Sequence, residues 1–160
     1  MRFRHMTSVY LKNGDNYLLL YRTGSRVVEP SYIGTAGGHF ETCELGDPEA
    51  CVLRELYEET GLTGDDIENL SLRYVTQRLK NGEIRQNHYF FADLKRPERA
   101  VSSNEGTLRW FEESSLASLP MPHSARAALN HYISIGKHTR SVYVGASVED
   151  GCAFTELTEF

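Results

Sequence analysis

The alternation of apolar and polar positions along the chain predicts two β-hairpins. The first runs from Val9 to Arg22, where two β-prone segments flank the turn sequence NGDN. The second covers residues 70–94 and turns at NGE (81–83). Further strands are expected in segments outside these hairpins: 32–38, 108–111, 141–148 and 152–160. A sheet is therefore the expected centre of the fold.

A helical pattern replaces the strand pattern between residues 47 and 61 (DPEACVLRELYEETG). Asp47 is a natural N-cap and Pro48 suits the first helical position. Gly61 suits the residue just after the helix, where a positive φ is needed. A second helix is predicted over residues 123–136. This order of elements favours an α/β (α+β) fold with helices on both sides of a mixed β-sheet.

The two sides of the first predicted helix differ in chemistry. At 100° per residue, its apolar side is expected to carry Ala50, Leu53, Leu56 and Tyr57. The opposite side is expected to carry three glutamates, Glu55, Glu58 and Glu59. Like charges three or four residues apart repel by roughly 0.2–0.5 kcal/mol. The crowding of these carboxylates therefore needs an explanation.

A solvated acidic face is the simplest explanation of such a cluster. Three neighbouring features favour a ligand site instead: Arg54 directly before the first glutamate, the Gly37–Gly38 pair upstream, and Gly61 directly after the helix. Carboxylate oxygens are hard ligands suited to Mg²⁺ or Mn²⁺. Such ions hold substrate phosphates and activate water, and glycines let a ligand approach the main chain closely.

Composition and charge narrow the range of functions. The 160 residues favour a single domain, 1–160, in which 137–160 is expected as a C-terminal β extension. A formal net charge of −5 argues against a surface for duplex nucleic acid. The apolar runs are too short to span a membrane. The three cysteines show no CxxC spacing, and no export signal is evident, so a cytoplasmic protein with reduced thiols is expected.

The segment 37–62 resembles the signature of the Nudix hydrolase family. In that signature a glycine is followed by a glutamate, by an Arg-Glu pair, and by Glu-Glu and glycine. Gly38 and Glu44 match with five residues between them, and the run from Arg54 to Leu62 matches without a gap. The chain departs from the signature at one point, because nine residues instead of seven separate Glu44 from Arg54. The role of Glu44 is therefore left open.

The resemblance implies a fold, a reaction and roles for residues. The fold is an α/β/α sandwich, and the reaction is hydrolysis of a nucleoside diphosphate linked to another group, X, by water with Mg²⁺ or Mn²⁺. The implied metal ligands are Glu55, Glu58, Glu59 and the carbonyl of Gly37. Arg54 is expected to orient the glutamates by ion pairing. The general base is either Glu55 or Glu105, which lies in a later loop.

Three residues are candidates for contacts with the substrate. Arg22 ends the second strand, where it could neutralise a phosphate, although a solvent-facing charge is an equal alternative. His123 and Ser124 lie at the start of the last predicted helix, in a region where relatives that act on oxidised purine nucleotides often read the base. The alternative for this pair is a helix cap.

Within the resemblance, the expected substrate is a nucleoside triphosphate, including oxidised forms such as 8-oxo-dGTP, cleaved to the monophosphate and pyrophosphate. ADP-ribose, sugar nucleotides and dinucleoside polyphosphates are alternatives. A different interpretation is a non-catalytic, nucleotide-binding regulatory module, although such modules usually lose part of the glutamate set that this chain keeps. Relatives are commonly dimers, so a homodimer supported by residues 141–160 is also expected.

Overall fold

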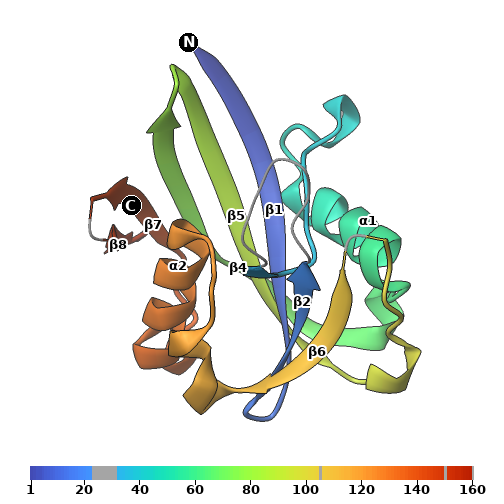
Figure 1. Cartoon of the computed structure of the whole chain (residues 1–160). Helices are drawn as coiled ribbons and strands as arrows, with labels where there is room; N and C mark the ends of the chain where they lie inside the picture. The colour runs from blue at the N-terminus through green and yellow to red at the C-terminus, as the bar shows by residue number, and fades with distance from the viewer. Residues whose placement is uncertain (23–31, 105, 150, 160) are drawn as a thin grey trace.

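The computed structural model describes residues 1–22, 32–104, 106–149 and 151–159. These residues form strands, α-helices and short 3-10 helices, and Figure 1 shows their arrangement. The strands are β1 (Arg2–Asn13), β2 (Asn16–Arg22), β3 (Tyr32–Gly34), β4 (Ile67–Lys80), β5 (Glu83–Leu94), β6 (Thr107–Glu112), β7 (Tyr143–Val148) and β8 (Gly151–Glu156). The α-helices are α1 (Pro48–Thr60) and α2 (His123–Ser134). Short 3-10 helices are η1 (Thr42–Glu44), η2 (Gly64–Asp66), η3 (Pro97–Arg99), η4 (Glu113–Ser118) and η5 (Gly136–His138).

The strands form one mixed sheet in the described part of the chain. Its order is β3-β2-β1-β5-β4-β7-β8, and β6 pairs with β2. The pairs β1–β5 and β4–β7 are parallel, while β1–β2, β4–β5 and β7–β8 are antiparallel. Both predicted hairpins and the strand pair predicted at the C-terminal end are therefore confirmed.

The middle of β1 pairs with the glycine-containing segment instead of with β2. The Cα partners of β1 and β2 run only from Leu11 to the turn. Upstream of that point, Thr7 N donates to Gly38 O (2.9 Å) and Val9 N donates to Ala36 O (2.8 Å). This pairing holds the Gly37–Gly38 bend beside β1, close to the centre of the sheet.

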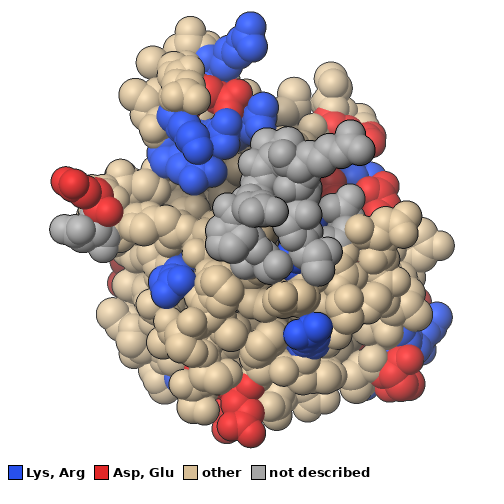
Figure 2. Space-filling view, in the orientation of Figure 1, with Lys and Arg blue, Asp and Glu red and all other residues tan. Residues whose placement is uncertain are grey.

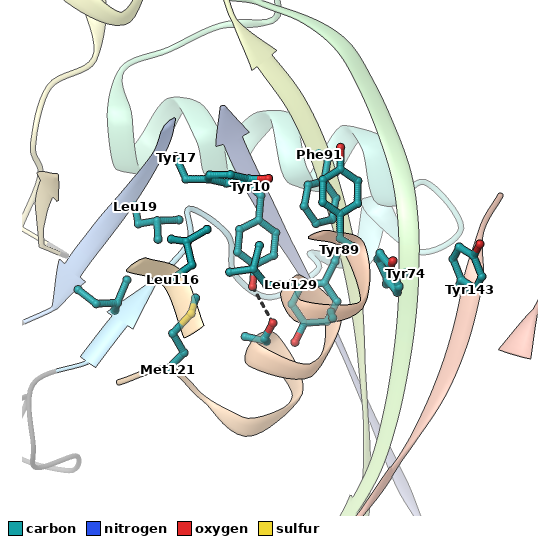
Figure 3. Packing of buried hydrophobic residues seen from close by; sticks show 14 residues of the cluster. Tyr10, Tyr17, Leu19, Tyr74, Tyr89, Phe91, Leu116, Met121, Leu129 and Tyr143 are labelled. Atoms are coloured by element: carbon teal, nitrogen blue, oxygen red, sulfur yellow. Dashed lines mark hydrogen bonds between the residues drawn. The ribbon is translucent and has the colours of Figure 1, made fainter. Parts of the chain in front are cut away.

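The helices cover opposite faces of the sheet (Figure 1), as the sequence predicts. Successive strand residues point to opposite faces, so Val9 packs with Val52 and Leu56 of α1, while Tyr10 packs with the residues of α2. Figure 3 shows the cluster between the sheet and α2, in which the hydroxyl of Tyr10 donates to the carbonyl of Ala125 (2.9 Å). Each face of the sheet therefore has its own apolar core.

The buried side of α1 differs from the predicted one. Ala50 and Tyr57 face solvent, and Tyr57 is 61% exposed. The residues that α1 buries are Cys51, Val52, Leu56, Glu59 and Thr60. The helix is thus rotated toward its acidic side, and the prediction for Ala50 and Tyr57 is wrong. A carboxylate can take this buried position because cationic and N–H donors meet it there.

The C-terminal strands extend the sheet beyond β4. A buried arginine supports this junction, because the guanidinium of Arg73 donates to the carbonyls of Gly136 (2.8 Å), Thr139 (3.0 Å) and Ser141 (3.0 Å). These bonds satisfy carbonyls at the end of α2 and in the connection to β7. As for membrane segments, none of the helices in the described ranges is long and apolar enough to cross a bilayer.

Candidate active site

The glycine bend lies directly against the acidic helix. The backbone N–H of Gly37 donates to Glu59 Oε2 (2.8 Å). A Cβ atom placed on Gly38 would lie 2.4 Å from Glu55 Oε1, so the carboxylate of Glu55 occupies the space that a side chain would need. Two glutamates of α1 therefore meet the bend, which explains why glycine is required there.

Arg54 connects the acidic residues. Its Nη1 donates to Glu55 Oε1 (2.8 Å) and to Glu58 Oε2 (3.1 Å), and its Nε donates to Glu44 Oε1 (2.7 Å). Its Nη2 donates to Glu44 Oε2 (2.9 Å) and to the carbonyl of His39 (3.0 Å). The ion pairing expected of Arg54 is present, and it fixes the carboxylates relative to the bend.

The sequence left the role of Glu44 open. Its carboxylate is buried, takes two hydrogen bonds from Arg54, and accepts another from the backbone N–H of Glu41 (2.8 Å). The two additional residues between Glu44 and Arg54 are absorbed by the loop after η1, so the pair still meets. The position of Glu44 in the motif was the signal for this contact.

The Glu44–Arg54 pair should make stability depend on acid pH. Hydrogen bonding from Arg54 lowers the pKa of Glu44 from 4.5 to about 2. Because the folded-state pKa lies below the unfolded one, the stabilisation is complete above pH 4.5 and is lost as the pH falls toward about 2. In urea unfolding measured across this range, the stability difference between the wild type and Glu44→Gln should shrink toward low pH.

A matched control for this measurement is Glu98→Gln, because Glu98 is exposed. It removes one carboxylate without touching Arg54, so its small effect should not follow the same pH profile. A pH-independent difference for Glu44→Gln would show that Glu44 acts through packing and not through its charge.

Glu59 and Arg22 form a second ion pair at the bend. The Nη2 of Arg22 donates to Glu59 Oε1 (2.8 Å), so this arginine faces the site and not solvent. Burial raises the pKa of Glu59, and Arg22 opposes that shift. The side chain of Glu58 is 54% exposed. The three glutamates thus differ in environment although they share one helix.

The donor set has the chemistry that a hard divalent cation requires. Carboxylate oxygens of Glu55 and Glu59 lie beside the Gly37–Gly38 backbone, and Glu58 stands at the solvent side of the same turn. In the described residues, no three His, Cys, Asp or Glu side chains are already grouped around one point. Arginine nitrogens contact these carboxylates. Arg54 donates to Glu55 and Glu58, and Arg22 donates to Glu59.

A cavity of about 550 Å³ opens beside the bend. Its volume falls within the range of small-ligand sites, roughly 300–1,000 Å³. The lining residues that carry charge or hydrogen-bonding groups include Arg22, Glu55, Glu59, Thr76, Arg78, Arg85, Asn87, Tyr89 and Ser124. The lining residues of β4 and β5 were not identified from the sequence. They occur at every second position, as residues on one face of a strand do.

The structure separates the two candidates at the start of α2. Ser124 is buried, lines the cavity and accepts a hydrogen bond from the hydroxyl of Tyr89 (3.1 Å). His123 is exposed and is not among the cavity-lining residues. Neither acts as the cap, because Pro122 holds the N-cap position. Glu105 lies outside the described residues.

Fold and site together define a class of protein: a mixed α+β domain in which an acidic helix faces a glycine bend across a polar cavity. The chain belongs to the Nudix family, because the sequence profile of the NUDIX domain matches residues 2–132.

Individual relatives are more distant. GDP-mannose pyrophosphatase of Yersinia pestis (strain Pestoides F) is 32% identical over 106 residues, which cover 59% of this chain and 52% of that protein. The chain therefore spans about half the length of the curated relatives it matches. The mutator MutT protein from Bacillus halodurans has a similar fold, with a TM-score of 0.68, 20% identity, and coverage of 96% of this chain and 97% of that one. A C. elegans Ap4A hydrolase, in a binary complex, gives a TM-score of 0.66 at 17% identity, covering 87% and 100% of the two chains.

Proposed function

We propose that this protein hydrolyses a phosphoric anhydride bond in a nucleoside diphosphate linked to a further group, X. The observation that carries the proposal is the contact of Glu55 and Glu59 with the Gly37–Gly38 bend at the edge of a cavity large enough for a nucleotide. Hydrolases of this family generally need a divalent metal ion. Mg²⁺ is the ion we propose, with Mn²⁺ as a substitute.

The proposed ligands of that ion are Glu55, Glu58, Glu59 and the carbonyl of Gly37. When bound, the ion supplies activation of a water molecule and stabilisation of charge on the phosphate. Arg54 orients Glu55 and Glu58 by ion pairing, and Arg22, which pairs with Glu59, would neutralise a phosphate beside it. Glu55 or Glu105 takes the proton of the attacking water. Ser124 contacts the substrate inside the cavity, whereas His123 is a candidate only for a part of the substrate that extends outside it.

A nucleoside triphosphate is the proposed substrate, with oxidised purine forms such as 8-oxo-dGTP included. It would be cleaved to the nucleoside monophosphate and pyrophosphate. A sugar nucleotide is the second candidate, because the 32% identical relative is named a GDP-mannose pyrophosphatase. The two candidates differ in the group X, which is a charged phosphate in the first and a neutral sugar in the second.

A substrate panel should separate these candidates. The purified protein would be incubated with GTP, 8-oxo-dGTP, GDP-mannose, ADP-ribose and Ap4A, in Mg²⁺, in Mn²⁺ and in EDTA, and the products identified by chromatography. We expect the triphosphates to yield the monophosphate and pyrophosphate, and we expect EDTA to abolish turnover.

Mannose 1-phosphate as the main product would favour the sugar-nucleotide candidate. Nucleotide binding without turnover in either metal would favour the non-catalytic regulatory module. Turnover that persists in EDTA would contradict the metal-dependent mechanism.

A further inference from the structure

Three arginines stand side by side on neighbouring strands next to the cavity. In the sheet register, Arg4 of β1 lies opposite Arg85 of β5, and Arg78 of β4 lies opposite Arg85 on its other side. We call Arg4, Arg85 and Arg78 the arginine row. Side chains at directly opposed positions share a face of the sheet, and like charges there are destabilising. Such a row is therefore unfavourable unless an anion meets it.

The protein itself supplies little negative charge to the arginine row. Glu83 accepts a hydrogen bond from Arg85 Nε (2.7 Å) and lies 3.3 Å from Arg4 Nε. Over the stretch that the structure describes, the side chain of Arg78 makes no ion pair or hydrogen bond. The next row outward adds two more cations, since Arg2 and Lys80 lie opposite Glu83. Figure 2 shows Lys and Arg side chains gathered at the end of the molecule where β1, β4 and β5 project.

Two members of the arginine row share the cavity with the acidic helix, and the row lies away from the bend. Arg78 and Arg85 line that cavity together with Glu55 and Glu59. Along β1, Arg4 precedes Thr7, the partner of Gly38, by three residues, which corresponds to roughly 10 Å of strand. A ligand in the cavity can therefore be bound at both places, by different parts of its structure.

We infer that the arginine row is a second anion subsite, which binds a phosphate group of the substrate beyond the two phosphates of the cleaved anhydride. Guanidinium groups suit phosphate because they present several N–H donors in one plane. The inference rests on the proposed function and narrows its substrate class. A nucleoside triphosphate, or a nucleotide with an additional phosphate on its sugar, satisfies the subsite, whereas GDP-mannose offers no such group.

Binding without turnover tests the subsite directly. Calorimetry in EDTA would compare inorganic tripolyphosphate with pyrophosphate for the wild type and for the variants Arg78→Gln, Arg85→Gln and the double variant. We expect the wild type to bind tripolyphosphate at least about tenfold more tightly, as one additional charged hydrogen bond implies. The double variant should reduce this preference to less than about twofold.

Arg140→Gln is the matched control, because Arg140 is exposed and does not line the cavity. It changes the net charge equally and should leave the preference unchanged. Since Arg78→Gln relieves repulsion within the arginine row, its melting temperature should equal or exceed that of the wild type. An unchanged preference in the double variant would overturn the subsite.

Kinetics test the assignment of substrate class. For the double variant, kcat/KM should fall about tenfold or more for at least one of GTP and guanosine 3′-phosphate 5′-diphosphate, mainly through KM, but less than twofold for GDP-mannose. If kcat/KM falls for GTP, the arginine row binds the third phosphate of the 5′-triphosphate. If it falls for guanosine 3′-phosphate 5′-diphosphate, the row binds the phosphate on the ribose. An equal fall for all three would overturn the inference. If no nucleotide is hydrolysed while the tripolyphosphate preference depends on Arg78 and Arg85, the proposed function fails and the subsite stands.

Discussion

Glu58→Gln should lower kcat of the metal-dependent reaction by about 100-fold or more, the order of loss seen when a group that stabilises transition-state charge is removed. Stability should hardly change, because the side chain of Glu58 is 54% exposed and its ion pair with Arg54 is at the surface. Surface ion pairs contribute roughly 0–1 kcal/mol. Steady-state kinetics with Mg²⁺, together with a urea unfolding curve, measure both quantities.

Glu58 is a cleaner choice than Glu59 for this experiment. Loss of the Glu59 carboxylate would also remove the acceptor of the Gly37 N–H and the ion pair with Arg22, so activity and stability would fall together. Glu49→Gln is the matched control, because Glu49 is an exposed glutamate in the first turn of the same helix. Its kcat should stay within about twofold. Full activity in Glu58→Gln would refute the metal role proposed for this residue.

Local chemistry explains why the elements could be predicted. At the start of α1, the side chain of Asp47 accepts from the backbone N–H of Ala50 (3.0 Å), and at its end Gly61 has a φ of 70°. These features depend on residues adjacent in sequence, as do the turns of both hairpins. The rotation of α1 could not be predicted in this way, because burial of Glu59 depends on Arg22 and Gly37, which are distant in sequence.

The same distinction applies to the candidate site. The spacing of glycines and glutamates indicated which residues gather at the bend, and the contacts of Gly37 and Gly38 with Glu59 and Glu55 agree with it. The arginine row could not be found from spacing, because it depends on the parallel register of β1 and β5, whose paired residues are about 80 positions apart. Such a register is set by packing across the whole sheet.

Gly37→Ala should destabilise the fold by about 2–5 kcal/mol, combining backbone strain with overpacking. The φ of Gly37 is 151°, which L side chains rarely adopt. A Cβ atom there would lie 2.1 Å from the carbonyl oxygen of Thr7 and 2.7 Å from Cα of Ser8. Both atoms are backbone of β1, so relief requires the bend to separate from the sheet. Urea unfolding at neutral pH measures the loss.

Gly38→Ala is the informative comparison, because the same added methyl group meets a different kind of neighbour. Its Cβ would contact the carboxylate of Glu55, at 2.4–2.5 Å, which is the end of a flexible side chain. That carboxylate can move away, so stability should fall by less than in Gly37→Ala, by about 1 kcal/mol. The movement takes Glu55 from its place against the bend, so metal-dependent turnover should fall by at least about tenfold. Wild-type stability of Gly37→Ala would show that the bend tolerates a side chain there, and full activity of Gly38→Ala would show that the reaction does not need Glu55 in this position.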